Sequence, residues 1–431
     1  MGYGHDETDG YFVFTLSGPS IYPNGLNRDY AIVRSIAHYL SRNRVGTSSV
    51  RQPMAGIYLH VPFCKQACHY CDFHFSTNTR QRGAMISAMV QELGQQRHYL
   101  DKDEVATIYF GGGTPSLLSP PEVDQLLQAV YRHFPVAAHP EITLEANPDD
   151  LTYGAAQRWR QGGINRLSVG IQSFYDPHLV YLNRAHNAHE AAVCVQRAQD
   201  AGFDNVSIDL IYAIPAEGHR IWKQDLAQAI ALGPQHISAY CLTIEEKTVF
   251  GRWRQQGKLR VVSDEVAAEQ FDILTSALAA AGYEAYEVSN FCQPGAYARH
   301  NTSYWQGKKY LGIGPSAHSY DGASRQYNVP NNAKYLRAVE RGSLAYEREV
   351  LSRYDRINEQ VITGLRTKWG CDLVRLRKVE HYDLYEENRA YLDQLVAGEK
   401  VTMEEGRLVL THQGRLLADG IAERLFLVNV E

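Results

Sequence analysis

Three cysteines lie within eight consecutive residues of this 431-residue chain, in the segment HVPFCKQACHYCDF that begins at His60. Three residues separate Cys64 from Cys68, and two separate Cys68 from Cys71. A loop of this length can place three thiolates at three corners of an iron–sulfur cubane. The fourth iron then receives no ligand from the motif, and an open iron can bind a small chelating molecule and pass it an electron. The spacing therefore predicts a 4Fe–4S cluster.

A zinc site is the alternative for the same cysteines. Zinc prefers four ligands in a closed tetrahedron, and His60, His69 or His74 would have to supply the fourth. Three structural cysteines fit less well, because buried residues follow the periodicity of a core element. The chain has seven cysteines. An odd number with three members clustered favours metal ligation in a reducing compartment over a disulfide framework.

Composition excludes several classes of protein. Hydrophobic residues make up 44% and charged residues 21% of the chain, so a folded core is expected. The net charge is −5 and there is no long basic run, so we expect no nucleic-acid partner. No segment has the apolar length of a membrane span, and no secretory signal is recognisable. We expect a cytoplasmic protein that contacts membranes at most transiently.

Apolar, β-branched runs alternate with helical patterns through the first two thirds of the chain. The runs lie at residues 57–61, 105–110, 142–146, 166–171, 206–211 and 236–242, and the helices between them at 80–100, 121–134, 152–161, 188–201 and 220–231. Buried strands separated by helices of this length form βα units. Six in succession predict an α/β fold, a partial (β/α)6 TIM-like barrel open on one side. A helix at 264–281 and a strand at 284–290 are expected to extend it.

Polar groups follow the ends of these predicted strands. Cys64 follows the first strand and the segment GGGTP at 111–115 follows the second, while Glu145, Gln172 and Asp209 lie near the ends of the next three. Chemistry in such barrels collects at the carboxyl ends of the strands. We therefore expect these groups to converge on one site.

The βα rhythm divides the chain into four regions. Residues 1–53 form an N-terminal extension, with a short strand at 11–16, a helix at 28–41 and a linker at 45–53. Either this is a genuine arm, or Met54 is the native start. Residues 54–290 form the barrel, and residues 291–349 extend it.

Residues 350–431 are predicted to form a small C-terminal domain. Helices are expected at 357–365 and 384–397, a hairpin at 401–410 that turns at Glu405-Gly406, and a last helix at 411–426. Helices followed by a hairpin resemble a winged-helix fold.

The cysteine spacing resembles the signature of the radical S-adenosylmethionine superfamily. In that family three cysteines hold a 4Fe–4S cluster, and the amino and carboxylate groups of S-adenosylmethionine chelate the fourth iron. The resemblance implies further contacts with S-adenosylmethionine. Gly112, Gly113 and Thr114 resemble the glycine-rich motif that receives the methionine amino group. The remaining candidates are Tyr58, Tyr70, Glu145, Gln172, Arg184 and Asp209.

Within the superfamily, residues 54–431 most resemble the branch that contains oxygen-independent coproporphyrinogen III oxidase and the heme chaperone HemW. The oxidase motif has a fourth cysteine two positions after the third, where this chain has Phe73. This departure disfavours coproporphyrinogen decarboxylation, and it leaves open whether the protein is an enzyme.

The segment HNTSYW, which starts at His300, resembles the HNxxYW motif of the chaperone branch, where the histidine is associated with heme. Imidazole is a good axial ligand for heme iron. The resemblance implies heme binding by His300, Tyr304 and Trp305, with His318 as a second candidate, whereas Cys292 is expected to be a buried structural residue. It implies a heme chaperone that carries a 4Fe–4S cluster and exchangeable S-adenosylmethionine and delivers heme to an acceptor protein, for which a respiratory protein is one candidate. The alternative is a radical oxidoreductase acting on coproporphyrinogen III or another tetrapyrrole.

Overall fold

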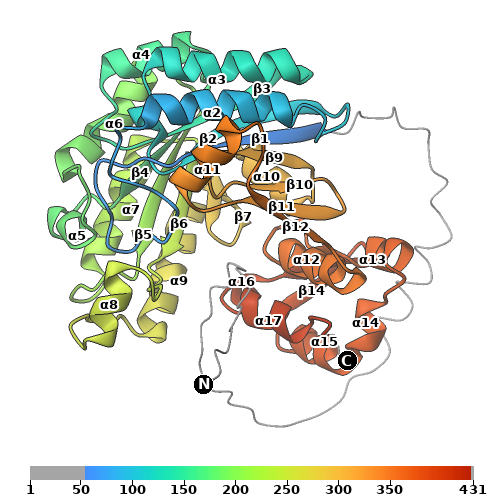
Figure 1. The fold of residues 1–431 in the computed structure, drawn as a ribbon. Helices are drawn as coiled ribbons and strands as arrows, with labels where there is room; N and C mark the ends of the chain where they lie inside the picture. The colour runs from blue at the N-terminus through green and yellow to red at the C-terminus, as the bar shows by residue number, and fades with distance from the viewer. Residues whose placement is uncertain (1–53, 429–431) are drawn as a thin grey trace, which may run out of the picture.

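The structure is a computed structural model that describes residues 54–428. The N-terminal extension predicted over residues 1–53, with its strand and helix, lies outside the described residues. In the described part, a strongly curved sheet with helices on its outer side forms the larger body, and a group of short helices lies beside it (Figure 1).

Six parallel strands form the centre of a twelve-stranded sheet. They are β1 (Met54–Val61), β2 (Glu104–Gly112), β3 (Val136–Ala146), β4 (Arg166–Gln172), β5 (Val206–Tyr212) and β6 (His236–Cys241), adjacent in chain order. The register places Ile57 opposite Ile108 of the next strand. Because side chains alternate across a strand, Ile57 and Leu59 pack into the outer core, while Tyr58 and His60 face the inside of the curve.

Helices on the outer side cover this apolar face. They are α2 (Arg82–Gln95), α3 (Pro120–His133), α4 (Tyr153–Gln161), α6 (Ala188–Asp200), α7 (Arg220–Leu232) and α9 (Asp264–Ala280), and shorter helices α5 (Asp176–Tyr181) and α8 (Val249–Gln255) lie near the strand ends. Helix α3 begins with a capping box of Ser119 and Glu122, which satisfies exposed backbone donors. The predicted (β/α)6 partial barrel is confirmed.

The prediction of one continuous strand at residues 284–290 is wrong. The segment is a hairpin of β7 (Glu284–Glu287) and β8 (Asn290–Cys292), and β8 pairs antiparallel with β6. The Glu287 carboxylate accepts hydrogen bonds from the Ser289 backbone N–H (2.9 Å) and the Asn290 side chain (2.5 Å). These bonds stabilise a tight turn where a continuous strand was expected.

Four further strands extend the opposite edge of the sheet. Strand β9 (Tyr310–Ile313) pairs parallel with β1, and β10 (His318–Tyr320), β11 (Ser324–Asn328) and β12 (Tyr346–Val350) follow it in antiparallel order. Helix α10 (Arg299–Trp305) precedes β9, and α11 (Asn332–Glu340) packs on α2. Thus the region at 291–349 completes one side of the barrel.

The C-terminal region has its own apolar core and a three-stranded antiparallel sheet. Its elements are α12 (Arg353–Leu365), β13 (Cys371–Asp372), α13 (Leu373–Val379), α14 (Leu384–Glu387), α15 (Arg389–Ala397), β14 (Val401–Glu404), β15 (Arg407–Leu410), α16 (His412–Arg415) and α17 (Ala418–Arg424). The predicted last helix is therefore broken in two. Gly414 lies so close to the Lys400 carbonyl that a Cβ could not fit, so α16 is fixed to the hairpin while α17 turns away to pack in the core.

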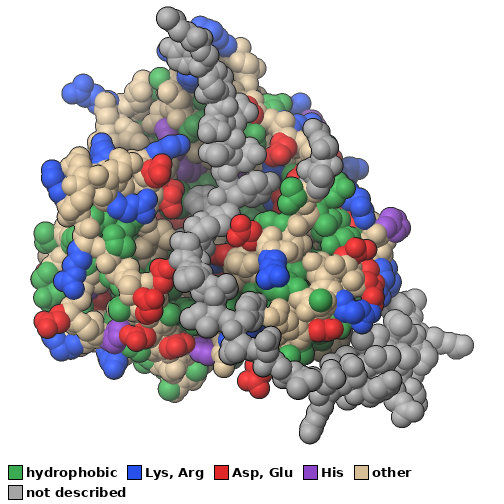
Figure 2. Space-filling model, turned by 90° about the horizontal axis from the view of Figure 1, so that it is seen from below, with side chains coloured by type: hydrophobic (Ala, Val, Ile, Leu, Met, Phe, Trp, Pro, Cys, Tyr) green, Lys and Arg blue, Asp and Glu red, His purple; other side chains and the backbone are tan. Residues whose placement is uncertain are grey.

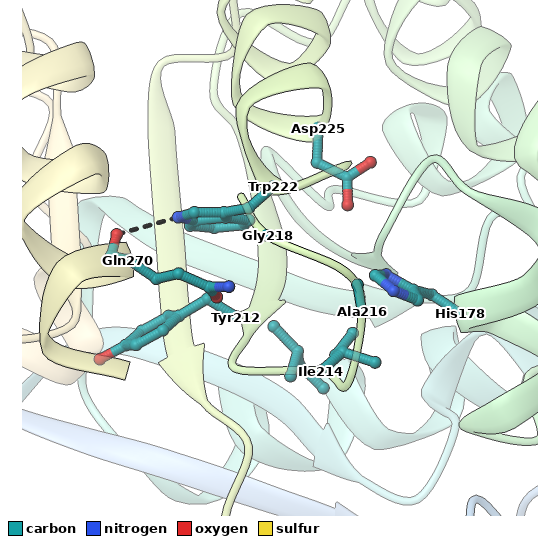
Figure 3. A pocket seen from close by; sticks show the side chains of 9 residues that line it. His178, Tyr212, Ile214, Ala216, Gly218, Trp222, Asp225 and Gln270 are labelled. Carbon is teal, nitrogen blue, oxygen red and sulfur yellow. Dashed lines mark hydrogen bonds between the residues drawn. The ribbon is translucent and has the colours of Figure 1, made fainter. Parts of the chain in front are cut away.

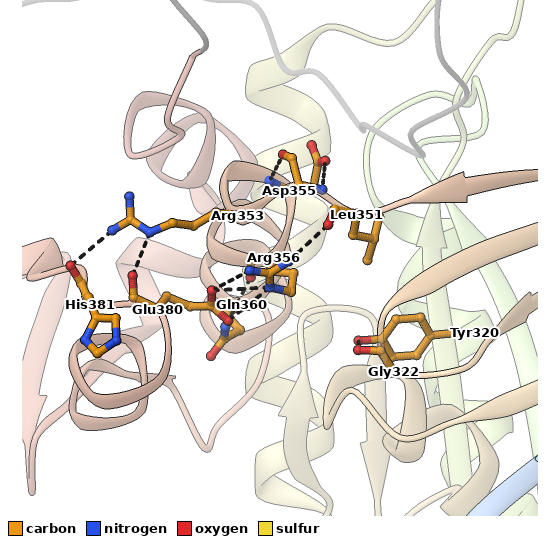
Figure 4. A network of polar contacts seen from close by, with 10 residues as sticks. Tyr320, Gly322, Leu351, Arg353, Asp355, Arg356, Gln360, Glu380 and His381 are labelled. Carbon is orange, nitrogen blue, oxygen red and sulfur yellow. Dashed lines mark hydrogen bonds and ion pairs between the residues drawn. The ribbon is translucent and has the colours of Figure 1, made fainter. Parts of the chain in front are cut away.

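A polar network attaches α12 to its surroundings (Figure 4). The Arg356 guanidinium donates to the Leu351 carbonyl at 3.0 Å and forms an ion pair with the buried Glu380 at 3.2 Å. Arg353 donates to the Glu380 and His381 carbonyls. These bonds join the end of β12 and the first turns of α12 to the carboxyl end of α13.

Candidate cofactor site at the mouth of the barrel

The loop that carries the three cysteines is fixed to the barrel at several points. The Cys64 N–H donates to the Ser76 carbonyl (3.1 Å), and the His69 N–H donates to the Leu182 carbonyl (3.0 Å). Lys65, within the motif, forms ion pairs with Asp149, at 2.7 Å, and with Asp150. The loop is thus held over the carboxyl ends of the strands, as the strand pattern predicted.

The three thiols are partly exposed and lie close enough to interact electrostatically. Burial raises the pKa of Cys64 to about 11 and that of Cys71 to about 12, so both are protonated without a metal. Iron binding would displace these protons. Among residues 54–428, no three His, Cys, Asp or Glu side chains converge as the ligands of one metal ion would. A tetrahedral zinc site requires that convergence, whereas a cubane distributes its ligands over separate irons.

Glycines at the end of β2 let the backbone pack directly against the cysteine loop. A Cβ on Gly113 would lie 2.6 Å from the Phe63 carbonyl oxygen, and one on Gly112, whose φ is +103°, would meet the His60 ring. The Gly113 N–H donates to the Val61 carbonyl (2.9 Å), and the Thr114 N–H donates to that of Phe63 (2.7 Å). Only residues without side chains fit here. This closely packed segment, the glycine cradle, therefore holds the cysteine loop against the end of β2 beside the thiols.

Arg184 connects the thiols to the strand ends. Its Nη1 lies 3.3 Å from Cys68 Sγ and 3.4 Å from the Tyr70 hydroxyl, and its Nη2 donates to Asn147 Oδ1 (2.6 Å) and the Gly170 carbonyl (2.8 Å). Its Nε is buried without a hydrogen-bond partner in the described residues. An orphaned guanidinium N–H beside the thiols is suited to an anionic or carbonyl oxygen of a ligand.

Glu145 is a carboxylate at the carboxyl end of β3. The Tyr109 hydroxyl donates to its Oε1 at 2.8 Å, and burial raises its pKa to about 7. Tyr58 lies beside it, with its ring 6.0 Å from that of Tyr109. A carboxylate held with so few donors can accept hydrogen bonds from ribose hydroxyls or an ammonium group.

Asp209 and Gln172, which are also predicted to contact S-adenosylmethionine, lie on the neighbouring strands β5 and β4. Burial raises the pKa of Asp209 to about 6, although the Ser168 and Ser238 hydroxyls and the Arg184 charge favour its ionised form. Gln172 has φ +69°, a strained conformation for a side-chain-bearing residue, which tends to occur at functional sites. The structure thus brings together the nine residues predicted to contact S-adenosylmethionine around the cysteine loop.

Sequence reasoning missed several residues that position this site. The Asn147 side chain accepts a hydrogen bond from Arg184. The Asn183 side chain accepts a hydrogen bond, at 2.7 Å, from the side chain of Gln66 in the cysteine loop. Lys65 is bound by two acidic residues. The signal for Asn147 was present, because it lies two positions after Glu145 at the end of the same strand.

His300 and Tyr304, two of the residues predicted to bind heme, lie deeper in the barrel, where the His300 ring stacks on the rings of Tyr109 (5.0 Å) and Tyr58 (6.4 Å). His300 is 1% exposed, its Nδ1 lies 2.7 Å from Thr107 Oγ1, and its Nε2 lies 2.7 Å from the Tyr304 hydroxyl. Burial lowers its pKa to about 3. Both ring nitrogens are used, so this conformation presents no free nitrogen to an iron. Trp305 lies elsewhere, stacked on the Arg366 guanidinium at 5.5 Å.

The second heme candidate, His318, and the cysteine expected to be structural, Cys292, lie in different environments. His318 is exposed on β10, with its ring 5.5 Å from Tyr327. Cys292 is fully buried on β8, as expected for a structural residue.

The fold and the site define a radical S-adenosylmethionine class of protein. Residues 58–227 match the model of the radical SAM superfamily. The chain is 36% identical over 375 residues to the heme chaperone HemW of Mycobacterium tuberculosis, which covers 86% of this chain and 94% of that protein. It is 32% identical to HemW of Bacillus subtilis, over 85% and 98% of the respective chains. The chain therefore belongs to the HemW family of the radical SAM superfamily.

The solved structure of coproporphyrinogen III oxidase (HemN) from Escherichia coli, a radical SAM enzyme, superposes with a TM-score of 0.76 over 91% of this chain and 93% of its own, at 22% identity. This similarity shows a common fold. Family membership implies a 4Fe–4S cluster and S-adenosylmethionine, and the donor set fits them through three clustered thiols, a glycine cradle and an orphaned guanidinium N–H. No helix among residues 54–428 is long and apolar enough to cross a bilayer.

Proposed function

We propose that this protein is a heme chaperone: it binds heme, carries a 4Fe–4S cluster with exchangeable S-adenosylmethionine, and transfers heme to an acceptor protein. The main support for this proposal is the similarity to relatives named heme chaperones, which extends over almost the whole length of those relatives. The shared fold with an oxidase does not decide between the two activities.

Phe73 favours the chaperone over the oxidase. It occupies the position of the additional cysteine of the oxidase motif, and it is 55% exposed at the end of the cysteine loop. A phenyl ring can neither ligate iron nor transfer a proton. Its exposure instead provides an apolar contact close to the cluster loop.

The residues of the mouth have separable roles in this proposal. Cys64, Cys68 and Cys71 hold the cluster, and Gly112, Gly113 and Thr114 form a backbone cradle for the methionine part of S-adenosylmethionine. The cluster, when bound, supplies an open iron and an electron. Glu145 accepts from hydroxyl or ammonium groups, Arg184 places a positive charge against the thiolates, and Asp209, Gln172, Tyr58 and Tyr70 enclose the nucleoside.

Acidic and basic side chains alternate across the visible surface of one face, without a large region of a single sign (Figure 2). A cytoplasmic location and a respiratory acceptor remain part of the proposal.

The experiment is performed on anaerobically reconstituted protein. It should contain about four irons and four sulfides per chain, bind ferric heme, and form no protoporphyrinogen when given dithionite, S-adenosylmethionine and coproporphyrinogen III. Formation of protoporphyrinogen would establish the oxidoreductase instead. The Phe73→Cys variant is the matched control. It tests whether the missing cysteine alone explains the absence of coproporphyrinogen oxidase activity.

A further inference from the structure

The chain makes a strained turn at Gln172, where β4 ends. The Ser173 N–H donates to the Ile171 carbonyl at 2.9 Å, and Gln172 between them has a φ of +69°. A hydrogen bond from residue i+2 to residue i around a positive φ defines the rare form of the γ-turn, which is strained for a residue with a side chain. Such strain persists only where surrounding contacts hold the backbone in place.

The turn directs the Gln172 side chain toward the mouth of the barrel. Strand β4 has one extra residue here, because Gly170 pairs with Asp209 and Gln172 pairs with Leu210 of β5. Bulges of this kind redirect side chains beside binding sites. A Cβ added to Gly170 would lie 2.9 Å from the Gln172 amide nitrogen and 3.2 Å from Arg184 Nη2. The amide therefore lies beside the guanidinium that reaches the cysteine thiols.

Asp225, on the outer helix α7, holds the two residues that follow the turn. Its Oδ2 accepts a hydrogen bond from the Ser173 hydroxyl at 2.6 Å, and its Oδ1 accepts one from the Phe174 N–H at 2.9 Å. The carboxylate is buried, and burial raises its pKa to about 6, while the two hydrogen bonds favour the ionised form. Both oxygens bind neighbouring residues of one loop. This two-point contact, the Asp225 clamp, therefore restrains the loop directly after Gln172.

Two buried histidines support the clamped turn. His186 Nε2 lies 2.9 Å from the Ile171 carbonyl oxygen, which can only accept, so this imidazole donates there. His178 Nδ1 lies 3.4 Å from Ser173 Oγ. The Ser173 hydroxyl donates to Asp225, so Nδ1 is the donor in this contact and Nε2 is left as an acceptor. Burial lowers the pKa of both imidazoles to about 4, so both are neutral at pH 7.

A small cavity adjoins the clamp. It measures about 10 Å³, which is room for one water molecule. Asp225 and His178 lie on one side of it, and Tyr212 and Gln270 lie on the other (Figure 3). His178 Nε2 is buried and has no hydrogen-bond partner among residues 54–428, so a water molecule in the cavity would donate to it. No part of a nucleoside fits in this space, so Asp225 can act on a ligand at the mouth only through the loop.

We propose that Asp225 is a positioning residue for the S-adenosylmethionine site. By holding Ser173 and Phe174, it keeps Gln172 in the strained turn and keeps the Gln172 amide directed at the cofactor. This role rests on the proposed function, in which Gln172 encloses the nucleoside, and Asp225 itself does not touch the cofactor. A helix on the outer side of the barrel thus sets the affinity of a site on the inner side.

Substitutions at Asp225 test the clamp in full-length protein whose cluster is reconstituted anaerobically. Asp225→Ala should weaken S-adenosylmethionine binding about tenfold in equilibrium dialysis, because two buried donors lose their acceptor. Asp225→Asn should bind within about threefold of wild type, since the amide accepts from Phe174 and donates to Ser173, whose hydroxyl then turns to His178. Asp200→Ala, at the exposed end of α6, is the matched control and should bind normally.

A double-mutant cycle separates positioning from general stability. Glycine adopts a positive φ without strain but supplies no amide, so Gln172→Gly alone should also weaken S-adenosylmethionine binding. Because Asp225 acts through Gln172, adding Asp225→Ala to Gln172→Gly should weaken binding by less than about twofold further. A further loss of about tenfold in the Gln172→Gly background, or an unchanged affinity in Asp225→Ala, would overturn the positioning role.

Ser173→Ala is the milder variant and keeps the clamp testable should Asp225→Ala fail to fold. It removes one of the two hydrogen bonds to the carboxylate, so S-adenosylmethionine should bind about threefold more weakly, and wild-type affinity would contradict the clamp. Wild-type protein that carries the cluster but binds no S-adenosylmethionine would refute the proposed function along with the clamp. A failure confined to the variants leaves that function standing.

Discussion

The guanidinium of Arg184 lies 3.3 Å from the Sγ of Cys68, the middle ligand of the predicted cluster. Its other branch is held by Asn147 and the Gly170 carbonyl, so the charge cannot move away from the sulfur. A fixed cation beside a cluster ligand stabilises the more negative, reduced state of the cluster. Arg184 therefore belongs to the predicted nucleoside site and is also expected to influence the reduction potential of the cluster.

Replacing Arg184 with Gln should lower the reduction potential of the reconstituted cluster by on the order of 50–100 mV, the equivalent of one lost charge-assisted hydrogen bond. Arg184→Lys should lower the potential less, because lysine keeps the positive charge but lacks the planar guanidinium that bonds several groups at once. The measurement is a redox titration followed by electron paramagnetic resonance. Arg158→Gln, exposed on α4, is the control. A potential that is equal in Arg184→Gln and wild type would show that the contact is only structural.

The second prediction concerns the glycine cradle. Gly113→Ala places a Cβ 2.6 Å from the Phe63 carbonyl, so the cysteine loop must shift. We expect this variant to fold but to bind S-adenosylmethionine at least tenfold more weakly, measured by equilibrium dialysis on reconstituted protein.

Gly83→Ala is the matched control for this change. It lies in α2 with nothing within 4 Å of the added Cβ. It should bind S-adenosylmethionine normally and gain up to about 1 kcal/mol of stability, the usual preference of a helix for alanine over glycine. Normal affinity in Gly113→Ala would mean that the loop tolerates displacement and that the cradle is not essential.

The barrel was predictable because its strands and helices repeat with strong periodicity. Residues such as Ile57 and Leu59 alternate with Tyr58 and His60, and the helices carry apolar faces of matching length. The hairpin of β7 and β8 was not predictable, since strands of three or four residues carry no readable period. Its turn depends on the Glu287 carboxylate, a contact that only the folded chain reveals.

The site was predictable to a similar extent. Parallel strands bring their carboxyl ends together, so residue types at those ends were enough to predict a shared mouth. The motif around His300 supplied a residue type suited to heme, but it could not show that both nitrogens of the imidazole ring are hydrogen-bonded. Thr107 is far away in sequence, and its contact with the imidazole follows from the packing of α10 across β2.

The third prediction follows from the buried carboxylate of Glu145. Its pKa of about 7 in the folded protein exceeds the ordinary value of 4.5. The raised pKa costs no stability below pH 4.5, where both folded and unfolded chains are protonated, and the cost grows as the pH rises from 4.5 to 7. Cofactor-free Glu145→Gln should therefore unfold at a higher temperature than wild type at pH 8, with the gain diminishing toward pH 5.

The same variant should bind S-adenosylmethionine more weakly, because an amide replaces an acceptor carboxylate with a partial donor. Calorimetry at the two pH values gives the stability, and dialysis gives the affinity. Glu265→Gln, on the exposed first turn of α9, is the control and should show neither a large gain nor a loss of affinity. A gain that is equal at pH 5 and pH 8 would mean that Glu145 is ionised normally in the folded chain.

The last prediction separates stability from heme binding at His300. His300→Ala removes two buried hydrogen bonds and leaves a void, which should lower the free energy of unfolding by about 2–4 kcal/mol. The wild-type imidazole has a pKa of about 3 when folded and 6.5 when unfolded, so its stabilisation is lost as the pH falls below 6.5. The difference between wild type and variant should thus shrink by up to about 1.4 kcal/mol per pH unit in that range.

Heme affinity, measured at a temperature where both proteins are folded, should change less than twofold in His300→Ala. Tyr304→Phe is the milder comparison, because it removes only the hydroxyl that meets the imidazole Nε2. A loss of affinity above tenfold in folded His300→Ala, with Tyr304→Phe unaffected or improved, would mean that the imidazole leaves its buried contacts to bind iron. Heme would then have to open the packing between α10 and β2, and the stability of that contact would limit its affinity.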